Sequence, residues 1–336
     1  MKRWLRDQSR RHVVLGSAGL VIELAGAAAA RAEGGGFDAM QWLMRAQQAA
    51  LTRNYQGTLM FTAGGVVSSS KLSHQIDGRH RYERIDAMDG QERQQLRHND
   101  VVLTLWPQTR MAVFEPAERP ADFPALPAGQ HRALESYEAR LVGQERMAGM
   151  EADVVLLRPR DALRYAQRLW AERETGLLVR ADVLGPNGEL LESNAFSELR
   201  LGVRVSPDLI TGPMKRLEGY KVLRPQAQRV QLDGEGWALL KPVNGFQLLS
   251  CTRRALDPTA GADTERPLPL QLVFSDGLTH VSMFIEAFDA QRHKVLRTSL
   301  GATQTSMNRQ GDWWITTVGD VPMSTVQLFE NALQRR

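Results

Sequence analysis

The sequence predicts an α+β protein that consists of a large antiparallel sheet domain and a smaller second domain. Between residues 55 and 199, short runs of alternating apolar and polar residues follow one another, separated by Gly, Pro, Asn and Asp. Such dense turn punctuation is typical of an antiparallel meander. Between residues 205 and 226, Pro and Gly interrupt every pattern, and a second set of alternating runs then ends in a helical pattern. These features predict two domains joined by a linker.

The N-terminal segment has the features of a cleavable export signal. Basic residues in the first eleven positions precede an apolar run at 13–24 and a small-residue run at 25–30. Residues 30–32 match the A-x-A cleavage pattern, so residues 1–32 are predicted to be a signal peptide. Because Glu23 interrupts the apolar run, the segment is too short and too broken to span a membrane. The sequence does not decide between the Sec and twin-arginine (Tat) routes, and we expect Sec because no cofactor-binding motif requires folding before export.

Removal of residues 1–32 changes the charge of the protein. This segment carries six Lys/Arg and two acidic residues, a net charge of +4, which equals that of the whole chain. The mature protein is therefore close to neutral, and the sequence pI of 9.4 mainly reflects the leader. We expect no nucleic-acid partner, because such a partner requires a basic surface.

A helix is predicted at the start of the mature chain, over residues 38–51. Asp38 is a favourable N-cap, Gln41 completes a capping box, and Phe37 and Trp42 occupy the positions of a hydrophobic staple. The Met and Trp residues that follow at helical spacing have two interpretations, a wall that contacts a ligand or a face that packs on a sheet. Packing is the more common case, and it is the one that we expect.

Eleven strands are predicted between this helix and residue 199. They extend over Tyr55–Thr62, Val66–Gln75, His80–Asp86, Arg93–His98, Val101–Trp106, Arg110–Phe114, Tyr137–Met147, Ala152–Arg158, Tyr165–Ala171, Leu177–Leu184 and Leu190–Leu199. The Pro- and Ala-rich residues 115–129 are predicted to form a loop or short cap. A run of this length predicts a barrel or a strongly curved sheet with a helix inside it or across it. Such sheets can enclose apolar cavities, but periodicity does not distinguish a hollow interior from one that side chains fill.

The second domain is predicted to contain five strands and a final helix that begins near Pro322. The strands extend over Trp237–Leu240, Gly245–Arg253, Leu270–Phe274, Leu278–Ala287 and Trp313–Val318. The clearest pattern in the whole chain is the hairpin around Asp276-Gly277, since Asp-Gly between alternating apolar runs strongly favours a tight turn. In the strand after this turn, the two faces consist of Val281, Met283 and Ile285 and of Ser282, Phe284 and Glu286.

The sequence contains no common catalytic, metal-binding or nucleotide-binding motif. There is no G-x-S-x-G, H-E-x-x-H, G-x-G-x-x-G or Walker sequence. His74 and His80 fall on successive predicted strands, but exposed strand histidines are more common than metal ligands. The single cysteine, Cys251, is expected to be a buried small side chain. We therefore predict a protein that is not an enzyme and has no metal or cofactor.

Several short segments together form an ordered set along nearly the whole mature chain. In the first domain they are Tyr55–Thr58, His74–Gly78, Tyr82–Arg84, Asp89-Gly90, Tyr137, Gly143, Arg146, Ala148-Gly149, Arg158-Pro159, Arg164-Tyr165, Leu169-Trp170 and Thr175–Leu178. In the second domain they are Trp237, Pro242, Gly245-Phe246, Phe274–Leu278, Val281–Glu286 and Val318–Pro322. As a set they resemble the RseB/MucB family, the periplasmic regulators of the sigma-E envelope stress response.

The resemblance implies a fold and a location. Residues 33–204 are expected to form a domain similar to the lipoprotein carriers LolA and LolB, an unclosed antiparallel β-barrel with helices. Residues 205–226 are expected to be a linker, and residues 227–336 a smaller C-terminal α/β domain that binds an anti-sigma factor. A periplasmic location is implied, in agreement with the predicted signal peptide.

The resemblance also implies two partners. Members of the family bind the periplasmic segment of a membrane-bound anti-sigma factor of the RseA/MucA kind and shield it from proteolysis. Lipopolysaccharide or mislocalised lipoprotein is thought to relieve this shielding, so acyl chains are the second expected ligand. The sequence does not reveal the identity of the lipid or the oligomeric state, for which a homodimer is one alternative.

Candidate contact residues follow from the hairpin and from the aromatic residues of the first domain. The candidates for the peptide surface are Ser275, Asp276, Leu278 and Phe284, with simple turn formation as the alternative for the first two. The candidates for the lipid cavity are Trp42, Phe61, Trp106 and Trp170, with core packing as the alternative. A lipoprotein carrier of the LolA type is the alternative function, but it gives the second domain no role. A hydrolase is a weaker alternative, since no acid or serine stands out as a catalytic group.

Overall fold

The computed structural model describes residues 37–336 apart from 117–122, 127–129, 226 and 256–267. The predicted signal peptide and part of the predicted loop at 115–129 lie outside the described residues. Within the described part of the chain, no helix combines the length and apolar character that crossing a membrane requires.

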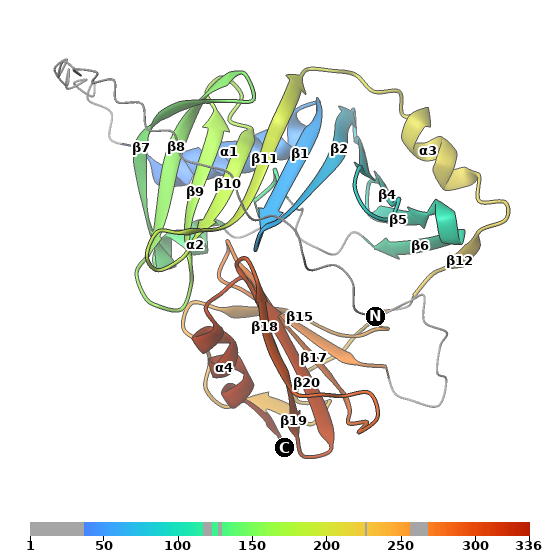
Figure 1. Cartoon of the computed structure of the whole chain (residues 1–336), viewed down its shortest axis with the longest axis vertical. Helices are drawn as coiled ribbons and strands as arrows, with labels where there is room; N and C mark the ends of the chain where they lie inside the picture. The colour runs from blue at the N-terminus through green and yellow to red at the C-terminus, as the bar shows by residue number, and fades with distance from the viewer. Residues whose placement is uncertain (1–36, 117–122, 127–129, 226, 256–267) are drawn as a thin grey trace, which may run out of the picture. The chain divides into compact units, whose positions relative to one another are not determined.

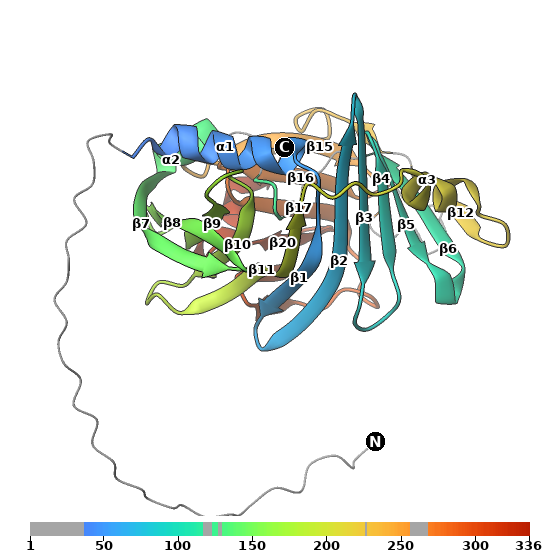
Figure 2. The same ribbon diagram turned by 90° about the horizontal axis from the view of Figure 1, so that it is seen from above.

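The N-terminal domain contains one open sheet of twelve strands. They are β1 (Tyr55–Ala63), β2 (Val66–Asp77), β3 (His80–Ala87), β4 (Gln94–His98), β5 (Val101–Trp106), β6 (Met111–Pro116), β7 (Tyr137–Met147), β8 (Met150–Pro159), β9 (Ala166–Glu172), β10 (Leu178–Leu184), β11 (Leu190–Leu201) and β12 (Lys221–Leu223). The spatial order is β12-β6-β5-β4-β3-β2-β1-β11-β10-β9-β8-β7, so that β12 and β7 are its two edges (Figures 1 and 2). A short 3₁₀ helix, η1 (Pro107–Thr109), separates β5 from β6. Each of the eleven predicted strands is present, and the prediction of an α+β fold with an unclosed sheet is confirmed.

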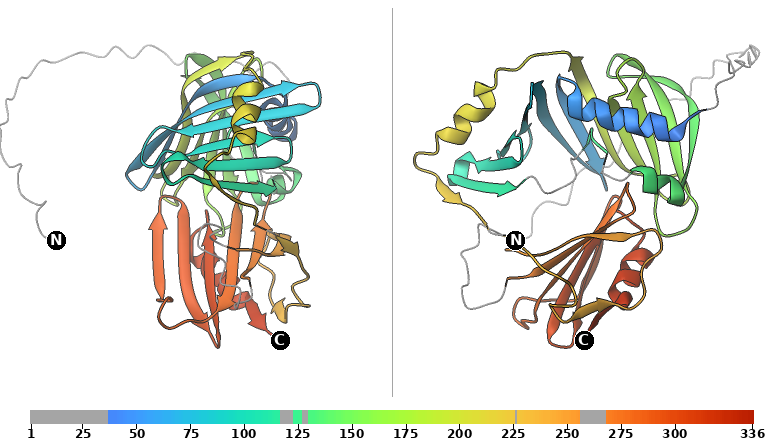
Figure 3. Two further views of the ribbon diagram at one scale, coloured as in Figure 1. Left: turned by 90° about the vertical axis from the view of Figure 1, so that its right-hand side faces the viewer. Right: turned by 180° about the vertical axis from the view of Figure 1, so that it is seen from behind.

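Helix α1 (Ala39–Thr52) lies across one face of this sheet, as the right-hand view of Figure 3 shows. Asp38 caps it as predicted, since its side chain accepts a hydrogen bond of 2.9 Å from the Gln41 N–H. The helix packs on the strands through Leu43 and three alanines, whose small side chains allow a close approach. Met44, by contrast, is 58% exposed, so the expected packing of the Met and Trp residues on the sheet does not hold at this position. A second helix, α2 (Gln130–Ser136), contacts α1 and β7.

The segment predicted as a linker contains a helix and a strand. Helix α3 (Asp208–Lys215) contacts β3 and β4, and Ile210 is fully buried in an apolar cluster with Leu96 and Leu103. After α3, β12 joins the sheet by parallel pairing with β6. Pro and Gly residues obscured this helix in the sequence, because Pro207 and Pro213 are also common in loops.

The described residues of the C-terminal domain form a seven-stranded sheet, a two-stranded sheet and one helix. The larger sheet consists of β13 (Gln228–Arg229), β15 (Gln247–Arg253), β16 (Leu270–Ser275), β17 (His280–Ala287), β20 (Trp313–Gly319), β19 (Thr303–Gln310) and β18 (Leu296–Leu300), in this spatial order. The smaller sheet pairs β14 (Trp237–Leu239) with β21 (Leu333–Arg335). Helix α4 (Met323–Ala332) contacts β19 and β20 (Figure 1).

The faces of β17 are those predicted from the sequence. Val281, Met283 and Ile285 are buried in the core with Phe329 of α4, whereas Phe284 on the opposite face is only partly buried. Cys251 is a free, buried residue of the same core, and burial raises the pKa of its thiol to about 11. The prediction of a buried small side chain at this position is therefore confirmed.

Gly57 of β1 illustrates a close approach that the fold requires. The pairing of β1 with β11 is irregular between Thr58 and Leu59, which brings β11 very near the Gly57 backbone. A Cβ atom at this position would meet the carbonyl oxygen of Glu198 and would lie 2.7 Å from the Phe196 ring. Only glycine fits here without displacement of the neighbouring strand.

Gly57→Ala is expected to lower the free energy of unfolding by about 1–3 kcal/mol, because overpacking against backbone cannot be relieved by a side-chain rotation. The measurement is urea denaturation monitored by circular dichroism. Gln56→Ala, at the adjacent exposed strand position, is the control and should leave stability nearly unchanged. Equal stability of the two variants would show that β11 can move away at little cost.

Candidate functional site

The turn between β16 and β17 is stabilised by its own side chains. The Oδ1 atom of Asp276 accepts hydrogen bonds of 2.9 Å from the N–H groups of Leu278 and Thr279. The hydroxyl of Ser275 donates to the carbonyl oxygen of Thr279 at 2.8 Å and accepts from the Gly277 N–H at 3.0 Å. These contacts are the local turn chemistry that Asp and Ser favour.

The second carboxylate oxygen of Asp276 binds an arginine of the N-terminal domain. Arg164 Nε donates to Asp276 Oδ2 at 2.8 Å, and both side chains are 0% exposed. The same guanidinium donates from Nη1 to Asp161 at 2.6 Å and from Nη2 to the Asn244 carbonyl oxygen at 2.9 Å. Gly245 leaves room for it, since a Cβ there would lie 2.6 Å from Arg164 Nη2. The buried cation therefore has partners on all three nitrogens.

Aromatic rings complete the surroundings of this cation. The Arg164 guanidinium carbon lies 5.0 Å from the Phe246 ring centroid and 5.8 Å from that of Tyr137, distances typical of cation–π contacts. Burial, followed by the negative charge of Asp276, raises the pKa of the Tyr137 hydroxyl well above its ordinary value. The charged side chains of Arg164 and Asp276 are thus enclosed, and the raised pKa keeps Tyr137 neutral.

Other contacts reinforce this junction, which we define by Arg164, Asp276, Leu278 and Thr325. Leu278 is buried in a cluster of the N-terminal domain that includes Tyr137. The hydroxyl of Thr325 in α4 donates to the Leu163 carbonyl oxygen at 2.8 Å. Three of the predicted peptide-contact residues, Ser275, Asp276 and Leu278, are therefore engaged inside the protein.

Asp276→Asn is expected to destabilise the protein by about 3 kcal/mol, because it removes the counter-charge of a buried arginine. The control is Arg140→Ala, which breaks the exposed Arg140–Glu138 pair and should cost less than about 1 kcal/mol. Chemical denaturation of both variants provides the comparison. Similar small effects would mean that Asp161 alone can compensate the Arg164 charge.

Two carboxylates, Glu192 of β11 and Asp320 after β20, repel each other electrostatically. Burial, followed by the negative charge of Asp320, raises the pKa of Glu192 to about 7, against the opposing hydrogen bond from Asn194. Asp320 accepts a hydrogen bond of 2.6 Å from the Thr303 hydroxyl. Burial also raises the pKa of the Tyr165 hydroxyl, against a hydrogen bond with Gln304 and with smaller contributions from the charges of Glu189 and Asp320. The pKa of the Glu192 carboxyl group is therefore close to neutrality.

The titration of Glu192 predicts a loss of stability as pH rises. Its folded-state pKa of about 7 exceeds the ordinary value of 4.5, so the folded protein retains a proton that the unfolded chain releases. The stabilising contribution is complete below the ordinary value and is lost as pH rises through about 7. Glu192→Gln should reduce the pH dependence of the thermal unfolding midpoint over this window. Glu198→Gln, at an exposed position of β11, should show the same pH dependence as wild type. Parallel pH profiles for wild type and Glu192→Gln would refute this assignment.

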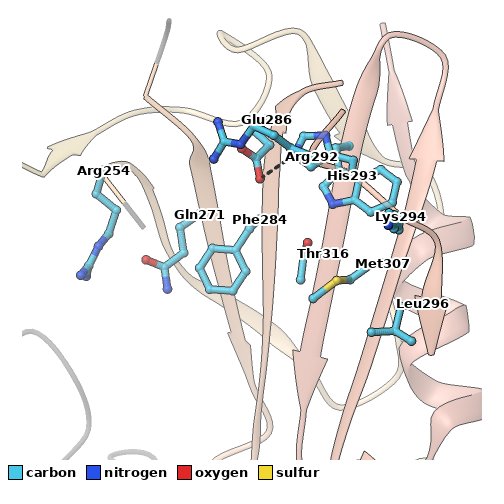
Figure 4. A pocket seen from close by; sticks show the side chains of 11 residues that line it. Arg254, Gln271, Phe284, Glu286, Arg292, His293, Lys294, Leu296, Met307 and Thr316 are labelled. Atoms are coloured by element: carbon cyan, nitrogen blue, oxygen red, sulfur yellow. Dashed lines mark ion pairs between the residues drawn. The ribbon is translucent and has the colours of Figure 1, made fainter. Parts of the chain in front are cut away.

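Phe284, the fourth predicted peptide residue, lines a pocket on the outer face of the C-terminal sheet (Figure 4). The pocket has a volume of ≈ 600 Å³, within the range of small-ligand sites. It is lined by Arg254, Gln271, Phe284, Glu286, Arg292, His293, Lys294, Leu296, Met307, Trp314 and Thr316. The apolar side chains project from neighbouring strands, and charged groups lie along its upper side in Figure 4.

His293 forms one wall of this pocket. Its ring stacks on Trp314 with centroids 4.7 Å apart and an interplanar angle of 5°. Its Nδ1 accepts a hydrogen bond of 3.0 Å from the Asp289 N–H, so a neutral ring carries its proton on Nε2. This nitrogen lies 3.6 Å from Glu286 Oε1 (Figure 4). The histidine thus stacks on Trp314 and lies beside Glu286, the one carboxylate among the described residues that line the pocket.

The four predicted lipid-cavity residues lie on four different elements. Trp170 of β9 is buried, donates from Nε1 to Glu145 at 2.9 Å, and has the Arg180 guanidinium 4.6 Å from its ring. Trp42 of α1 is partly buried against a different core cluster, and Phe61 of β1 and Trp106 of β5 are also partly buried. Their contact with lipid stays a prediction.

Sequence reasoning did not find the partners that complete these sites. Arg164 lies 112 residues before Asp276, and no local pattern indicates that the two meet. The pocket residues Leu296 and Met307 lie on β18 and β19, which were not predicted because polar residues and Arg outnumber the apolar residues in both strands. Among the described residues there is no group of three or more His, Cys, Asp or Glu arranged to hold a metal ion.

The fold and sites define a two-domain protein with a buried ionic junction and a ligand-sized pocket on its smaller sheet. Comparison with known families agrees with this division. The profile of the MucB/RseB N-terminal domain matches residues 38–214, and that of the MucB/RseB C-terminal domain matches residues 231–334. The chain belongs to the MucB/RseB family.

Individual relatives extend over most of the chain. The sigma factor AlgU regulatory protein MucB of Pseudomonas aeruginosa is 29% identical over 303 residues, covering 86% of this chain and 89% of that protein. The sigma-E factor regulatory protein RseB of Haemophilus influenzae is 23% identical over 290 residues, with the same coverage of 86% and 89%. The structure of the MucA/MucB complex of Pseudomonas aeruginosa matches at a TM-score of 0.66 and 25% identity, covering 88% of this chain and 98% of the matched one. A structure of MucB with MucA(peri) matches at a TM-score of 0.65 and 25% identity, covering 89% and 99%.

Proposed function

We propose that this protein is a periplasmic negative regulator of the sigma-E envelope stress response. In this role it binds the periplasmic segment of a membrane anti-sigma factor, protects that segment from proteolysis, and is released by lipopolysaccharide or mislocalised lipoprotein. The observation that carries the proposal is the match of both domains, in order, to a family whose MucB member forms a complex with MucA. A carrier that uses the first domain alone would leave the pocket of the second domain without a role.

The junction supplies a physical basis for regulation by two ligands. The buried Arg164–Asp276 pair and the docked Leu278 favour one arrangement of the two domains. A ligand can shift such an arrangement only by binding one state more tightly than another. We infer that the anti-sigma segment and the lipid favour different arrangements, so that each weakens the binding of the other.

Isothermal titration of the cognate anti-sigma periplasmic segment into the mature protein, with and without lipid A, tests this function. We expect binding without lipid and an affinity reduced by about 5–150-fold when lipid A is present, the usual range of coupling between two sites. A susceptibility assay with the site-1 protease should show slower cleavage of the bound segment. Absence of binding would refute the function, and unchanged affinity with lipid A would refute the coupling alone.

Thermodynamic reciprocity provides an internal control for the same experiment. If lipid A lowers the affinity for the segment by a given factor, the segment must lower the affinity for lipid A by that factor. Unequal factors would indicate a third process, such as aggregation of the lipid.

A further inference from the structure

One edge of the C-terminal sheet is not covered by any described strand. β18 is the last strand in the order of the sheet and pairs on one side with β19. All five of its residues are exposed, with exposed fractions of 49% at both Leu296 and Leu300, and Val295 just before the strand is 73% exposed. Leu300, at the far end of the strand, lies close to Gly64 of the N-terminal domain. Proteins usually protect such edges with charges, prolines or bulges. β18 has a single charged residue, Arg297, and its pairing with β19 is regular.

The pocket of Figure 4 extends to this edge. Strand register places Gln271, Phe284, Thr316, Met307 and Leu296 in one row across five neighbouring strands. Figure 4 shows these five side chains in sequence from β16 to β18. With strands about 4.8 Å apart, the row is about 19 Å long and ends at the free edge. A chain that paired with β18 would place alternate side chains on the same face as this row.

The charges around the row favour an anionic ligand. Three cations, Arg254, Arg292 and Lys294, line the pocket together with the carboxylate of Glu286. Arg254 is already paired with Glu115 at 2.7 Å. Among the described residues, no carboxylate forms an ion pair with Arg292 or Lys294. Arg292 and Lys294 therefore stand beside the apolar end of the row with no ion pair to another described residue.

We infer that β18 accepts an extended acidic peptide segment as an added strand, with an apolar side chain on Leu296 and Met307 and an acidic side chain at Arg292 or Lys294. This inference rests on the proposed function and assigns the chemistry of the anti-sigma segment that binds here. The bound part of the segment would have apolar residues at alternate positions and a carboxylate close to them. Backbone pairing supplies affinity in this mode of recognition, and the pockets for alternate side chains supply selectivity. A phosphorylated lipid has similar anionic and apolar groups, but it has no backbone to pair with a free strand edge.

Two variants of the mature protein, Leu296→Asp and Lys294→Glu, test the site. Short overlapping fluorescent peptides that cover the cognate anti-sigma periplasmic segment serve as probes in anisotropy titrations. Each variant should weaken binding of the acidic, alternating peptide by about tenfold or more, since each introduces a negative charge beside the acidic ligand. Lys241→Glu is the matched control, because it makes the same charge change at an exposed position of the same domain outside the pocket lining.

Hydrogen exchange distinguishes strand addition from other binding modes. The amides of residues 296–300 should become protected when the peptide binds to wild type, because outward-facing N–H groups acquire partners. Normal binding by both variants, together with unprotected β18 amides, would overturn the inference and leave the proposed function intact. Loss of lipid A binding in the variants with retained peptide binding would overturn it in favour of a lipid site. A wild-type protein that does not bind the whole segment would refute the proposed function itself.

Discussion

Arg164 and Asp276 carry opposite charges at a place that water does not reach, and this fact constrains how the two domains can move. Separation of the domains would leave each charge to be rehydrated or to find a new partner. The Asp276 carboxylate also caps the hairpin turn through two backbone N–H groups. The ionic contact and the turn geometry therefore depend on each other, and through them the position of β17 depends on Arg164.

The ion pair specifies an arrangement more than it strengthens the fold. Transfer of two charges out of water is costly, and the attraction between them often does no more than offset this cost. The stabilisation of the junction comes mainly from the burial of Leu278 in the N-terminal core and from the rings of Phe246 and Tyr137. The directional contacts of Arg164 then select one arrangement among those that would bury similar apolar area.

The sequence was most informative where local patterns determine structure. The alternation of Val281, Met283 and Ile285 predicted the buried face of β17, and Asp-Gly predicted its turn. The same reasoning gave Asp276 two interpretations, a peptide contact or simple turn formation. In the structure Asp276 caps the turn and also binds Arg164, 112 residues earlier in the chain, and its contact with a peptide stays a prediction. Such long-range pairs leave no local signal. β18 and β19 were missed for a different reason, since polar residues and Arg outnumber the apolar residues in both strands, and the alternation that normally reveals a strand is weak.

β17 connects the junction with the sheet-face pocket. Thr279, just before the strand, donates a hydrogen bond of 3.0 Å to the Asp320 carbonyl oxygen, and Phe284 and Glu286 further along it line the pocket. Because β17 pairs with β16 and β20 on both sides, it cannot bend without loss of backbone hydrogen bonds. Movement at the junction must therefore shift the sheet as a unit. In the proposed mechanism, a lipid on the N-terminal sheet would influence a peptide on the C-terminal sheet through the junction and the other contacts between the domains, such as the Arg254–Glu115 ion pair. The coupling could not exceed the free-energy difference between the domain arrangements that these contacts distinguish.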